Sequence, residues 1–284
     1  MTSKSNDNGR ALEYSVVDYF KKNHPNVVMS KNTLDDQKRD SIKFQNLPQD
    51  IKVSFTTAAK KFFIWYKSKN TNHKTIKIDR LSDSSGVVHD IVINSINFSV
   101  KHNHYALKHP RPYSLAIQCG FDKNDSENII HRNDMKIVSD NYRKNLNGIK
   151  KYNENKQLLS QLYASVNQIC KRSIDKWCKH NPLVIVNFFN FIVGTKFYKV
   201  IVSENNKTTN VEIQDFLNIP TPQSLVCVFD SKRSNYLNFT FNHGWIIDLR
   251  LHTASSMINT NPDSQLSLKF DAQKKSGNVK TFNI

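Results

Sequence analysis

The sequence predicts an α/β or α+β fold whose C-terminal half is rich in strands. Segments with apolar residues at helical spacing lie on both sides of a short cluster of strand-like segments, and further strand-like segments fill the last third of the chain. This order of elements is typical of one α/β or α+β domain. No internal repeat and no Pro/Gly-rich linker divides the 284 residues. We therefore expect a single domain over residues 1–284.

Helical spacing is clearest in residues 10–22, 56–67 and 151–179. Each of these segments places its apolar residues on one face, which predicts a helix packed against a core. Residues 183–193 are apolar on nearly all sides, so this segment is expected to be buried. Pro182 separates it from the long helix before it, because proline interrupts helical hydrogen bonding.

Other segments are polar or contain proline. Residues 30–50 are predicted to form a loop or a short helix, and residues 120–135 a loop. Pro110 and Pro112 exclude a helix in their own region. A short helix or strand is expected only after them, at residues 115–118.

Strand-like alternation begins at residues 74–81 and continues, after a turn at residues 82–86, into residues 87–104. The last of these segments has the pattern of two short strands joined by a turn. Further strands are predicted at residues 197–202, 225–229, 236–241, 245–252 and 266–270.

The charge of the chain indicates a polyanionic partner. The formal net charge is +17 and the pI is about 9.6, and nucleic acid is the commonest cellular polyanion. No apolar run is long enough to cross a bilayer, and the N-terminus lacks the apolar core of a signal peptide. We therefore expect a cytoplasmic protein without a membrane partner. None of the cysteines forms a CxxC pair, which argues against a zinc ribbon.

The hairpin at residues 87–104 carries the candidate site. Asp90 lies on its first strand, and Ser99-Val100-Lys101 lies on its second. Carboxylates bind hard cations such as Mg²⁺, and a neighbouring lysine can position water or stabilise a phosphorane oxyanion. Ser99 and Lys101 share one face of the strand because side chains alternate with a period of two. An ordinary cross-strand Asp–Lys pair is the alternative interpretation.

The residues after Lys101 are rich in hydrogen-bond donors. Basic, imidazole and amide groups follow within a few positions, which suits contacts to DNA phosphates. The candidates for DNA binding in this loop are His102, Asn103, His104, Lys108 and Arg111.

Several motifs together resemble the PD-(D/E)xK restriction endonucleases and, within them, the HaeIII-type enzymes. The matching stretches are residues 9–14, 99–112, 194–200, 249–256 and 267–271. The resemblance implies a central mixed sheet flanked by helices and a type II restriction endonuclease that cleaves double-stranded DNA with Mg²⁺ at a short, GGCC-like palindrome. It also implies a restriction–modification system with a cognate DNA methyltransferase.

On this resemblance the chain is divided by role. Residues 1–10 would be a flexible tail, residues 11–120 the catalytic core, and residues 121–284 a helical and strand-rich part that recognises DNA. The resemblance does not decide between a monomer and a homodimer.

The same resemblance makes Asp90 the metal-binding aspartate and Lys101 the catalytic lysine. Ser99 stands where the family pattern has a second acidic residue, and His89 stands where it has proline. A metal site with one carboxylate is weak, so another group must complete it. Glu13, on the first predicted helix, is the preferred substitute, and Gln118 is a neutral second choice.

The C-terminal motifs supply candidates for reading bases. Arginine or lysine bound to guanine is the commonest direct contact, and Arg250 and Lys269 lie in these motifs beside His252 and Ser255. Arg250 and Asp248 can equally be ordinary outward-facing strand residues.

Two other functions were weighed. The string His102-Asn103-His104 is not an HNH nuclease motif, because a ββα-metal site spreads its ligands over a hairpin and a helix, and Pro110 and Pro112 obstruct that helix. A non-enzymatic nucleic-acid-binding protein is the alternative, since a charge of +17 suffices for it.

Overall fold

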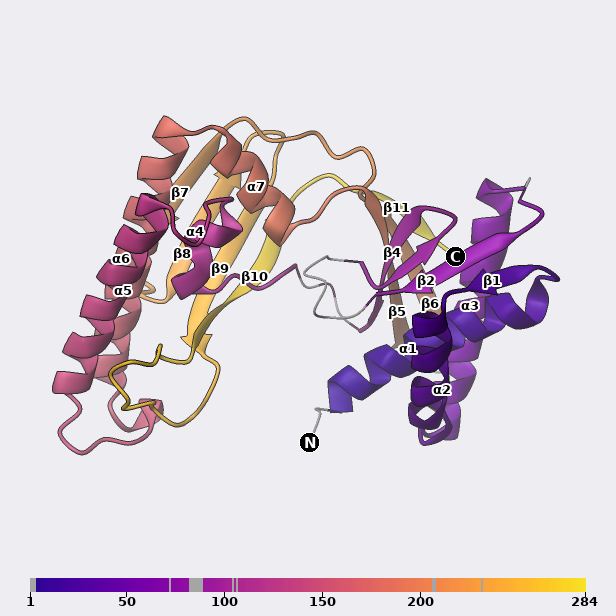
Figure 1. Ribbon diagram of the computed structural model, residues 1–284, viewed down its shortest axis with the longest axis horizontal. Coiled ribbons are helices and arrows are strands. Elements are labelled where there is room, and N and C mark those ends of the chain that lie inside the picture. The colour runs from indigo at the N-terminus through magenta and orange to yellow at the C-terminus, as the bar shows by residue number, and fades with distance from the viewer. Residues whose placement is uncertain are drawn as a thin grey trace. The chain divides into compact units, whose positions relative to one another are not determined.

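The computed structural model describes residues 4–71, 73–81, 89–103, 105, 107–205, 208–230 and 232–284. Its internal contacts divide the chain into two compact units, whose elements are labelled in Figure 1. The first unit contains Met1–Tyr105, Thr195–Ile219 and Val279–Ile284, and the second contains Ala106–Gly194 and Pro220–Asn278.

The first unit is built on a mixed β-sheet, called the first sheet here, in the order β1-β2-β3-β4-β5-β6-β11 among the described residues. Pairs β1/β2 and β4/β5 are parallel, and the other neighbours are antiparallel. The strands are β1 (Val27–Met29), β2 (Ile76–Arg80), β3 (Ile91–Ile93), β4 (Ile96–His102), β5 (Phe197–Asn205), β6 (Thr208–Asp215) and β11 (Lys280–Asn283).

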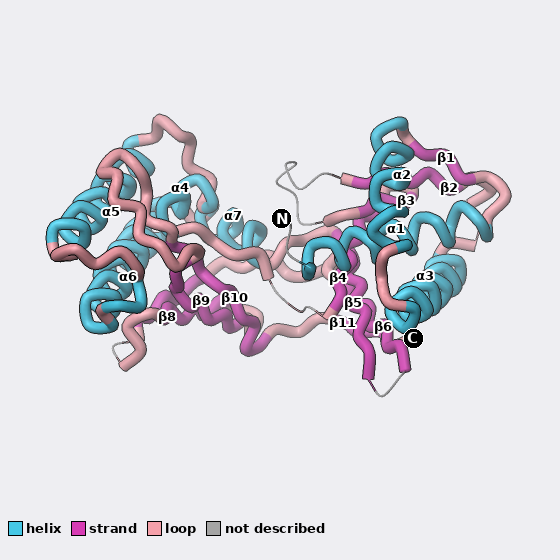
Figure 2. Tube along the Cα trace, turned by 90° about the horizontal axis from the view of Figure 1, so that it is seen from below, coloured by secondary structure: helices cyan, strands magenta, loops and turns pink. Residues whose placement is uncertain are grey.

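Three long helices accompany this sheet in the described part of the first unit. They are α1 (Lys4–Asn23), α2 (Lys31–Gln45) and α3 (Gln49–Lys69). Figure 2 shows them beside the strands of the first sheet. Close approaches join α1 to β4, α2 to β2 and α3 to β5 and β6, so each helix packs on the sheet as well as on its neighbours.

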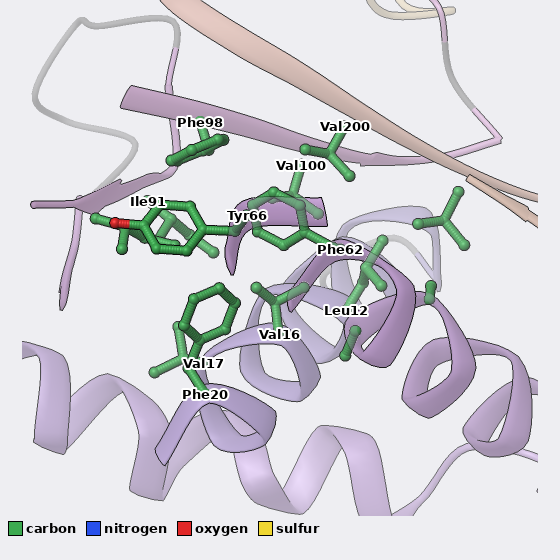
Figure 3. Close-up of a cluster of buried hydrophobic side chains, with 14 of the residues drawn as sticks. Leu12, Val16, Val17, Phe20, Phe62, Tyr66, Ile91, Phe98, Val100 and Val200 are labelled. Carbon is green, nitrogen blue, oxygen red and sulfur yellow. The ribbon is translucent and has the colours of Figure 1, made fainter. Parts of the chain in front are cut away.

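Aromatic side chains fill the core between α1, α3 and the first sheet (Figure 3). The ring of Phe62 lies 5.7 Å from that of Phe20 and 5.1 Å from that of Phe98, measured between centroids. Tyr66 lies 5.4 Å from Phe20. All four side chains are fully buried. Aromatic groups of this size bury large apolar areas, so this cluster fixes the two helices against the strands that carry the candidate site.

The second unit combines helices with an antiparallel sheet, called the second sheet here. Its described strands run in the order β10-β9-β8-β7, with bounds β7 Leu225–Phe229, β8 Tyr236–Phe241, β9 Ile246–Thr253 and β10 Leu268–Ser276. Its helical elements are η2 (Pro112–Ser114), α4 (Leu115–Gln118), α5 (Ser126–Lys144), η3 (Tyr152–Glu154), α6 (Lys156–His180) and α7 (Leu183–Ile192).

The mixed α/β prediction is confirmed, and most of the strongly patterned segments form the expected elements. The helices expected at residues 10–22, 56–67, 151–179 and 183–193 correspond to α1, α3, α6 and α7. The five C-terminal strand predictions correspond to β5, β7, β8, β9 and β10. Strands β1, β6 and β11 were not predicted.

Residues 120–135 do not form a loop, because α5 begins at Ser126. The buried face of α5 includes polar side chains, which hid its helical period. Asn128 Nδ2 donates to the carbonyl of Lys123 at 2.9 Å, and the ring nitrogens of His131 bond Ser173 Oγ and the Pro112 carbonyl. Internal partners of this kind let polar groups occupy a buried face.

The N-terminal segments are also more helical than predicted. Helix α1 begins at Lys4, so residues 4–10 are helical rather than a flexible tail. An ion pair of 3.1 Å between Asp7 and Lys43 ties this first part to α2. Residues 31–45 form a full helix, α2, although few of its residues are buried. Its Ser30 cap accepts a hydrogen bond from the Thr33 amide, which satisfies an otherwise free donor.

The units divide at Tyr105 and not at residue 120, because β5, β6 and β11 return to the first sheet from later in the chain. The assignment of residues 1–284 to one functional domain stays a prediction. In the part of the chain that the structure describes, no helix has the length and apolar character needed to cross a membrane.

Replacing Phe62 by alanine should lower the free energy of unfolding by about 3–5 kcal/mol, because it leaves a cavity between Phe20 and Phe98. Ile64→Ala is the matched control. Ile64 lies on the same helix but is 57% exposed, and its loss should change stability by no more than about 0.5 kcal/mol. Urea titration followed by circular dichroism measures both values. Equal effects would contradict the packing described for α3.

Candidate active site

Asp90 and Lys101 meet at the start of the β3–β4 hairpin. Asp90 lies immediately before β3, and Lys101 lies near the end of β4. The Lys101 Nζ atom is 3.0 Å from Asp90 Oδ2 and 3.3 Å from Oδ1. The two side chains are 32% and 17% exposed, so both remain open to solvent. The residues chosen from the sequence therefore form one contact pair, although Asp90 precedes the strand on which it was expected.

The turn of this hairpin explains how the pair comes together. Asn94 and Ser95 both have positive φ, which closes a two-residue turn between β3 and β4. The backbone N–H of Asp90 donates to the Phe98 carbonyl at 2.8 Å and so extends the ladder by one residue beyond β3. The hairpin register therefore places Asp90 beside the Ser99-Val100-Lys101 segment. Val87 and Val88, expected on the same hairpin, lie outside the described residues.

Ser99 and Val100 fix the orientation of the Asp90 carboxylate. The Val100 backbone N–H donates to Asp90 Oδ2 at 2.8 Å, and Ser99 Oγ donates to the same oxygen at 3.2 Å. Ser99, which stands where the family pattern has an acidic residue, thus donates a hydrogen bond to Asp90. Ser99 is buried, so its hydroxyl needs a polar partner, and Asp90 provides it.

Glu13 reaches this region from α1. Its carboxylate accepts hydrogen bonds from Arg80 Nη2 at 2.7 Å and from Arg10 Nη1 at 3.3 Å. Burial raises the pKa of Glu13, the negative charge of Asp90 raises it further, and Arg80 opposes both effects. The charge of Asp90 thus contributes to the raised pKa of Glu13, with burial as the larger cause.

Arg80 is the buried cation of this region. Its guanidinium is fully buried and also donates to Asp40 Oδ2 at 2.8 Å and to Gln37 Oε1 at 3.0 Å. Thr33 Oγ1 accepts a hydrogen bond from the Arg80 backbone N–H at 2.9 Å. These contacts join β2 to both α1 and α2. The Nη atoms of this buried charge are paired with carboxylates and an amide oxygen, while its Nε atom has no hydrogen-bond partner among the described residues. The same charge without these partners would be costly.

Sequence reasoning missed Arg80 and Asp40, although one signal pointed to Arg80. It follows Ile76 and Ile78 at alternate positions of a predicted strand, so it continues the buried face of β2. An arginine on such a face requires acidic partners. Nothing in the sequence identified Glu13 and Asp40, on two different helices, as those partners.

The comparisons with known proteins support the same interpretation. A family model described as HaeIII restriction endonuclease matches residues 9–275. The chain belongs to the HaeIII restriction endonuclease family. A curated relative, the type II restriction enzyme HaeIII of Haemophilus aegyptius, is 24% identical over 318 aligned residues, which cover 95% of this chain and 94% of the relative. No solved structure matches the chain.

Family membership confirms the resemblance found in the sequence and decides the class of protein. The chain is a type II restriction endonuclease of the HaeIII family, a hydrolase that acts on DNA. The alternative of a non-enzymatic nucleic-acid-binding protein is therefore not supported. The family does not by itself assign roles to Asp90, Lys101 or Glu13, which stay predictions.

A hard divalent cation requires oxygen donors, and the candidate site offers carboxylates. Within the described residues, no group of three or more His, Cys, Asp or Glu side chains could hold a metal ion. Burial raises the pKa of Glu13, and the negative charge of Asp90 raises it further. A cation between them would relieve this repulsion, and oxygen ligands are those that Mg²⁺ prefers. The two residues therefore fit a magnesium ion by charge and donor type.

His102 and Asn103 have a partner within the first unit. His102 Nε2 lies 3.0 Å from Glu204 Oε2, and Asn103 Nδ2 donates to the same oxygen at 3.1 Å. Ser54 Oγ donates to Glu204 Oε1 at 2.8 Å. The structure thus gathers both residues around Glu204 of β5, which sequence reasoning did not identify. Their binding to DNA stays a prediction, and His104 lies outside the described residues.

The remaining candidates of the 101–112 loop, and the second-choice metal ligand, lie in the second unit. Lys108 Nζ lies 4.6 Å from the centroid of the Phe191 ring, and burial lowers the pKa of Lys108. Gln118 Oε1 accepts a hydrogen bond from the Arg111 backbone N–H at 3.2 Å, while the Arg111 residue is exposed. Gln118 is thus not among the residues that surround Asp90 within the first unit.

The C-terminal candidates lie on or beside the second sheet. Arg250 and His252 are on β9, and Lys269 is on β10, paired opposite His252. Ser255 follows β9, where its Oγ accepts a hydrogen bond from the Met257 backbone N–H at 3.1 Å. Arg250 pairs with Asp271, as described below.

Arg80→Met should destabilise the protein by about 3–5 kcal/mol, because it leaves the buried carboxylate of Asp40 without its main internal cation. Arg39→Met is the matched control. Arg39 also binds Asp40 through two nitrogens, but its side chain is 54% exposed, so its loss should cost no more than about 1 kcal/mol. Chemical denaturation measures both. Equal losses would show that Arg80 is no more important to the fold than a surface ion pair.

Proposed function

We propose that this chain cleaves double-stranded DNA at a short palindromic sequence in a Mg²⁺-dependent reaction, through a PD-(D/E)xK-type site formed by Asp90, Glu13 and Lys101. The observation that carries the proposal is the contact between Lys101 and Asp90, together with the effect of the Asp90 charge on the pKa of Glu13. A GGCC-like recognition sequence is the specificity that the resemblance to HaeIII-type enzymes implies. A cognate DNA methyltransferase is the genetic partner that such an enzyme requires.

Asp90 and Glu13 would hold the magnesium ion. When bound, the ion would neutralise charge on the scissile phosphate and lower the pKa of a water molecule. Asp90 is suited to this task because Ser99 and Val100 already fix its orientation. Glu13 is suited because Arg80 fixes its carboxylate on the buried side. Glu13 would thus supply the second carboxylate, which Ser99 cannot provide.

Lys101 would act on the reacting phosphate or on the attacking water. Its ammonium group is partly exposed and held by Asp90, so it can donate a hydrogen bond to an oxygen whose negative charge grows in the transition state. In the reaction, the water oxygen forms a bond to phosphorus while the bond between phosphorus and the leaving ester oxygen breaks. The proton lost by the water passes to solvent, and the leaving oxygen takes up a proton from solvent. A cation fixed beside this centre stabilises the charge without reorganising.

Purified protein incubated with unmethylated plasmid DNA and Mg²⁺ should give discrete fragments, and a chelator should stop the reaction. The fragments would map the recognition sequence and show whether the ends are blunt or staggered. Intact plasmid across several DNA sequences and several divalent metals would overturn the proposed function.

Lys101→Ala, Asp90→Asn and Glu13→Gln should each reduce cleavage by about 100-fold or more, because each removes a group that binds the metal or stabilises transition-state charge. DNA binding should persist, since the other basic groups remain. Cleavage rates at saturating DNA and gel-shift binding separate the two effects.

Two variants serve as controls for these substitutions. Lys77→Ala removes an exposed lysine from the neighbouring β2, and Asp18→Asn removes a carboxylate on α1 that pairs with Lys22. Both should cleave like the unchanged protein. If Glu13→Gln also cleaves normally while its thermal unfolding is unaltered, Glu13 is not part of the site and another group must accompany Asp90.

A further inference from the structure

The second sheet has one apolar face and one polar face. On β9, Ile247, Leu249 and Leu251 are fully buried, whereas Arg250 and His252 between and after them are only half-buried. Apart from Asp248, which is buried although it lies on the same face as Arg250, this is the alternation of a strand with one face on the core. Arg250 and His252 therefore belong to the face opposite the core.

Helices cover the apolar face of this sheet. The ring of Phe188 on α7 lies 5.3 Å from that of Phe239, and Phe189 lies 5.1 Å from Phe241. Helix α6 approaches β7, β8 and β9, and Figure 1 shows α5 and α6 on one side of the sheet. The core of the second unit thus lies on that side, and the polar face points away from it.

The strand register brings a row of polar residues together on the polar face. Tyr236 of β8 pairs opposite Arg250 of β9, and Arg250 pairs opposite Asp271 of β10. His252 is next along β9 on the same face and pairs opposite Lys269. The polar face therefore carries five functional groups on neighbouring strands: the ring of Tyr236, the guanidinium of Arg250, the carboxylate of Asp271, the imidazole of His252 and the ammonium of Lys269.

Asp271 is the centre of this row. Its Oδ2 accepts a hydrogen bond from Arg250 Nη2 at 2.7 Å, and its Oδ1 lies 3.0 Å from His252 Nε2. The Nδ1 atom of His109 approaches the same oxygen at 3.8 Å. Burial alone would raise the pKa of Asp271, but the hydrogen bond from Arg250 and the charge of His252 outweigh it, and the pKa is lowered. The Asp271 carboxylate therefore holds Arg250 through a hydrogen bond, and it lies at ion-pair distance from His252 Nε2, which makes no hydrogen bond among the described residues.

The arginine in this row is fixed and yet accessible. Its side chain is 44% exposed, whereas that of Asp271 is 22% exposed. The planar guanidinium offers several donors in a rigid fork, and one carboxylate does not use them all. An arginine held in place before binding loses less conformational freedom when it contacts a ligand. Its geometry suits bidentate contact with the O6 and N7 atoms of guanine.

We propose that Asp271 is a positioning residue for sequence recognition, which holds Arg250 and His252 on the polar face of the second sheet so that Arg250 contacts guanine in the DNA site. The occupant of this face is duplex DNA. Basic Lys269 and the net charge of +17 complement its phosphates. The inference rests on the proposed function, because cleavage at a specific sequence requires contacts that read bases.

The competing interpretation is an ordinary cross-strand ion pair with no ligand. An exposed pair of that kind contributes little to stability. Removing it should then change neither the fold nor the choice of DNA sequence. The two interpretations therefore differ in selectivity, which a purely structural pair does not affect.

The chain supplies a matched control in Asp230 and Arg233. Arg233 Nε donates to Asp230 Oδ2 at 2.6 Å, and the two side chains are 51% and 22% exposed. These values are close to those of Arg250 and Asp271. The pair lies just after β7. Arg233 stacks on the ring of Tyr236 at 4.2 Å from its centroid, at the edge of the row, while Asp230 is not a member of the row. Asp230→Asn therefore removes an equivalent ion pair that has no proposed role in recognition.

The test compares the unchanged full-length protein with Asp271→Asn and Asp230→Asn. Each is incubated with duplexes that carry the site mapped by plasmid cleavage, or single-base variants of that site, and binding is measured by competition without Mg²⁺. The unchanged protein should bind the mapped site more tightly than a duplex in which one guanine of that site is replaced. In Asp271→Asn this preference should fall by about 5- to 150-fold, which is the range for one bidentate contact. Asp230→Asn should keep the full preference.

Salt dependence distinguishes base contacts from phosphate contacts. The slope of affinity against salt concentration should be the same in the unchanged protein and in Asp271→Asn, because the contact concerns a base. Equal weakening on all sequences would overturn base reading by Arg250. Unaltered selectivity in Asp271→Asn would overturn the inference altogether.

Arg250→Lys tests whether a loss of selectivity arises from the lost guanine contact or from a change in folding. It keeps the positive charge but removes the planar fork, so it should lose selectivity to a similar degree while its thermal unfolding matches that of the unchanged protein. If this variant keeps its selectivity, Arg250 does not read guanine. The two proposals fail separately: absence of any cleavage by the unchanged protein sinks the proposed function, whereas normal cleavage with normal selectivity in the variants sinks only this inference.

Discussion

The buried guanidinium of Arg80 is the constraint on which the first unit depends. A charge without access to water must be met by internal partners, and here they come from α1 and α2. The contacts fix both helices against β2. The next residue, Leu81, donates its backbone N–H to the Asp90 carbonyl at 3.0 Å. Arg80 therefore links α1, which carries Glu13, to β2, whose next residue, Leu81, is bonded to Asp90.

The site assembled by these contacts divides its acidic groups between two environments. Asp90 is partly exposed and is oriented by Ser99 and Val100 of its own hairpin. Glu13 is buried and is oriented by Arg80 of β2 and Arg10 of α1. Asp90 and Lys101 are therefore the solvent-accessible part of the proposed site, and Glu13 is its buried part. Ser99 donates a hydrogen bond to the Asp90 carboxylate and carries no negative charge of its own. Crowding a further carboxylate there would add repulsion.

Sequence reasoning identified the parts of the site that have local signals. Asp90 and Lys101 lie on neighbouring strands with a short turn, so alternation and turn chemistry were enough to pair them. Glu13 was proposed because a partner for Asp90 was missing, and its role stays a prediction; in the structure, the charge of Asp90 adds to the burial that raises the pKa of Glu13. Arg80 and Glu204 escaped because their partners come from distant segments. The period of α5 was hidden because the polar side chains of Asn128 and His131 replace apolar ones on its buried face.

The order in which the first sheet is assembled has a consequence for synthesis. Strand β4, which carries Lys101, pairs with β5, but β5 begins only at Phe197, after the helices of the second unit. The sheet then receives its last strand from residues 280–283. A nascent chain that has reached only residue 194 has made both Asp90 and Lys101, yet it lacks the strand that supports them. The β4–β5 pairing therefore cannot form until Phe197 and the residues after it have been made, and the first sheet is complete only once residues 280–283 have been added.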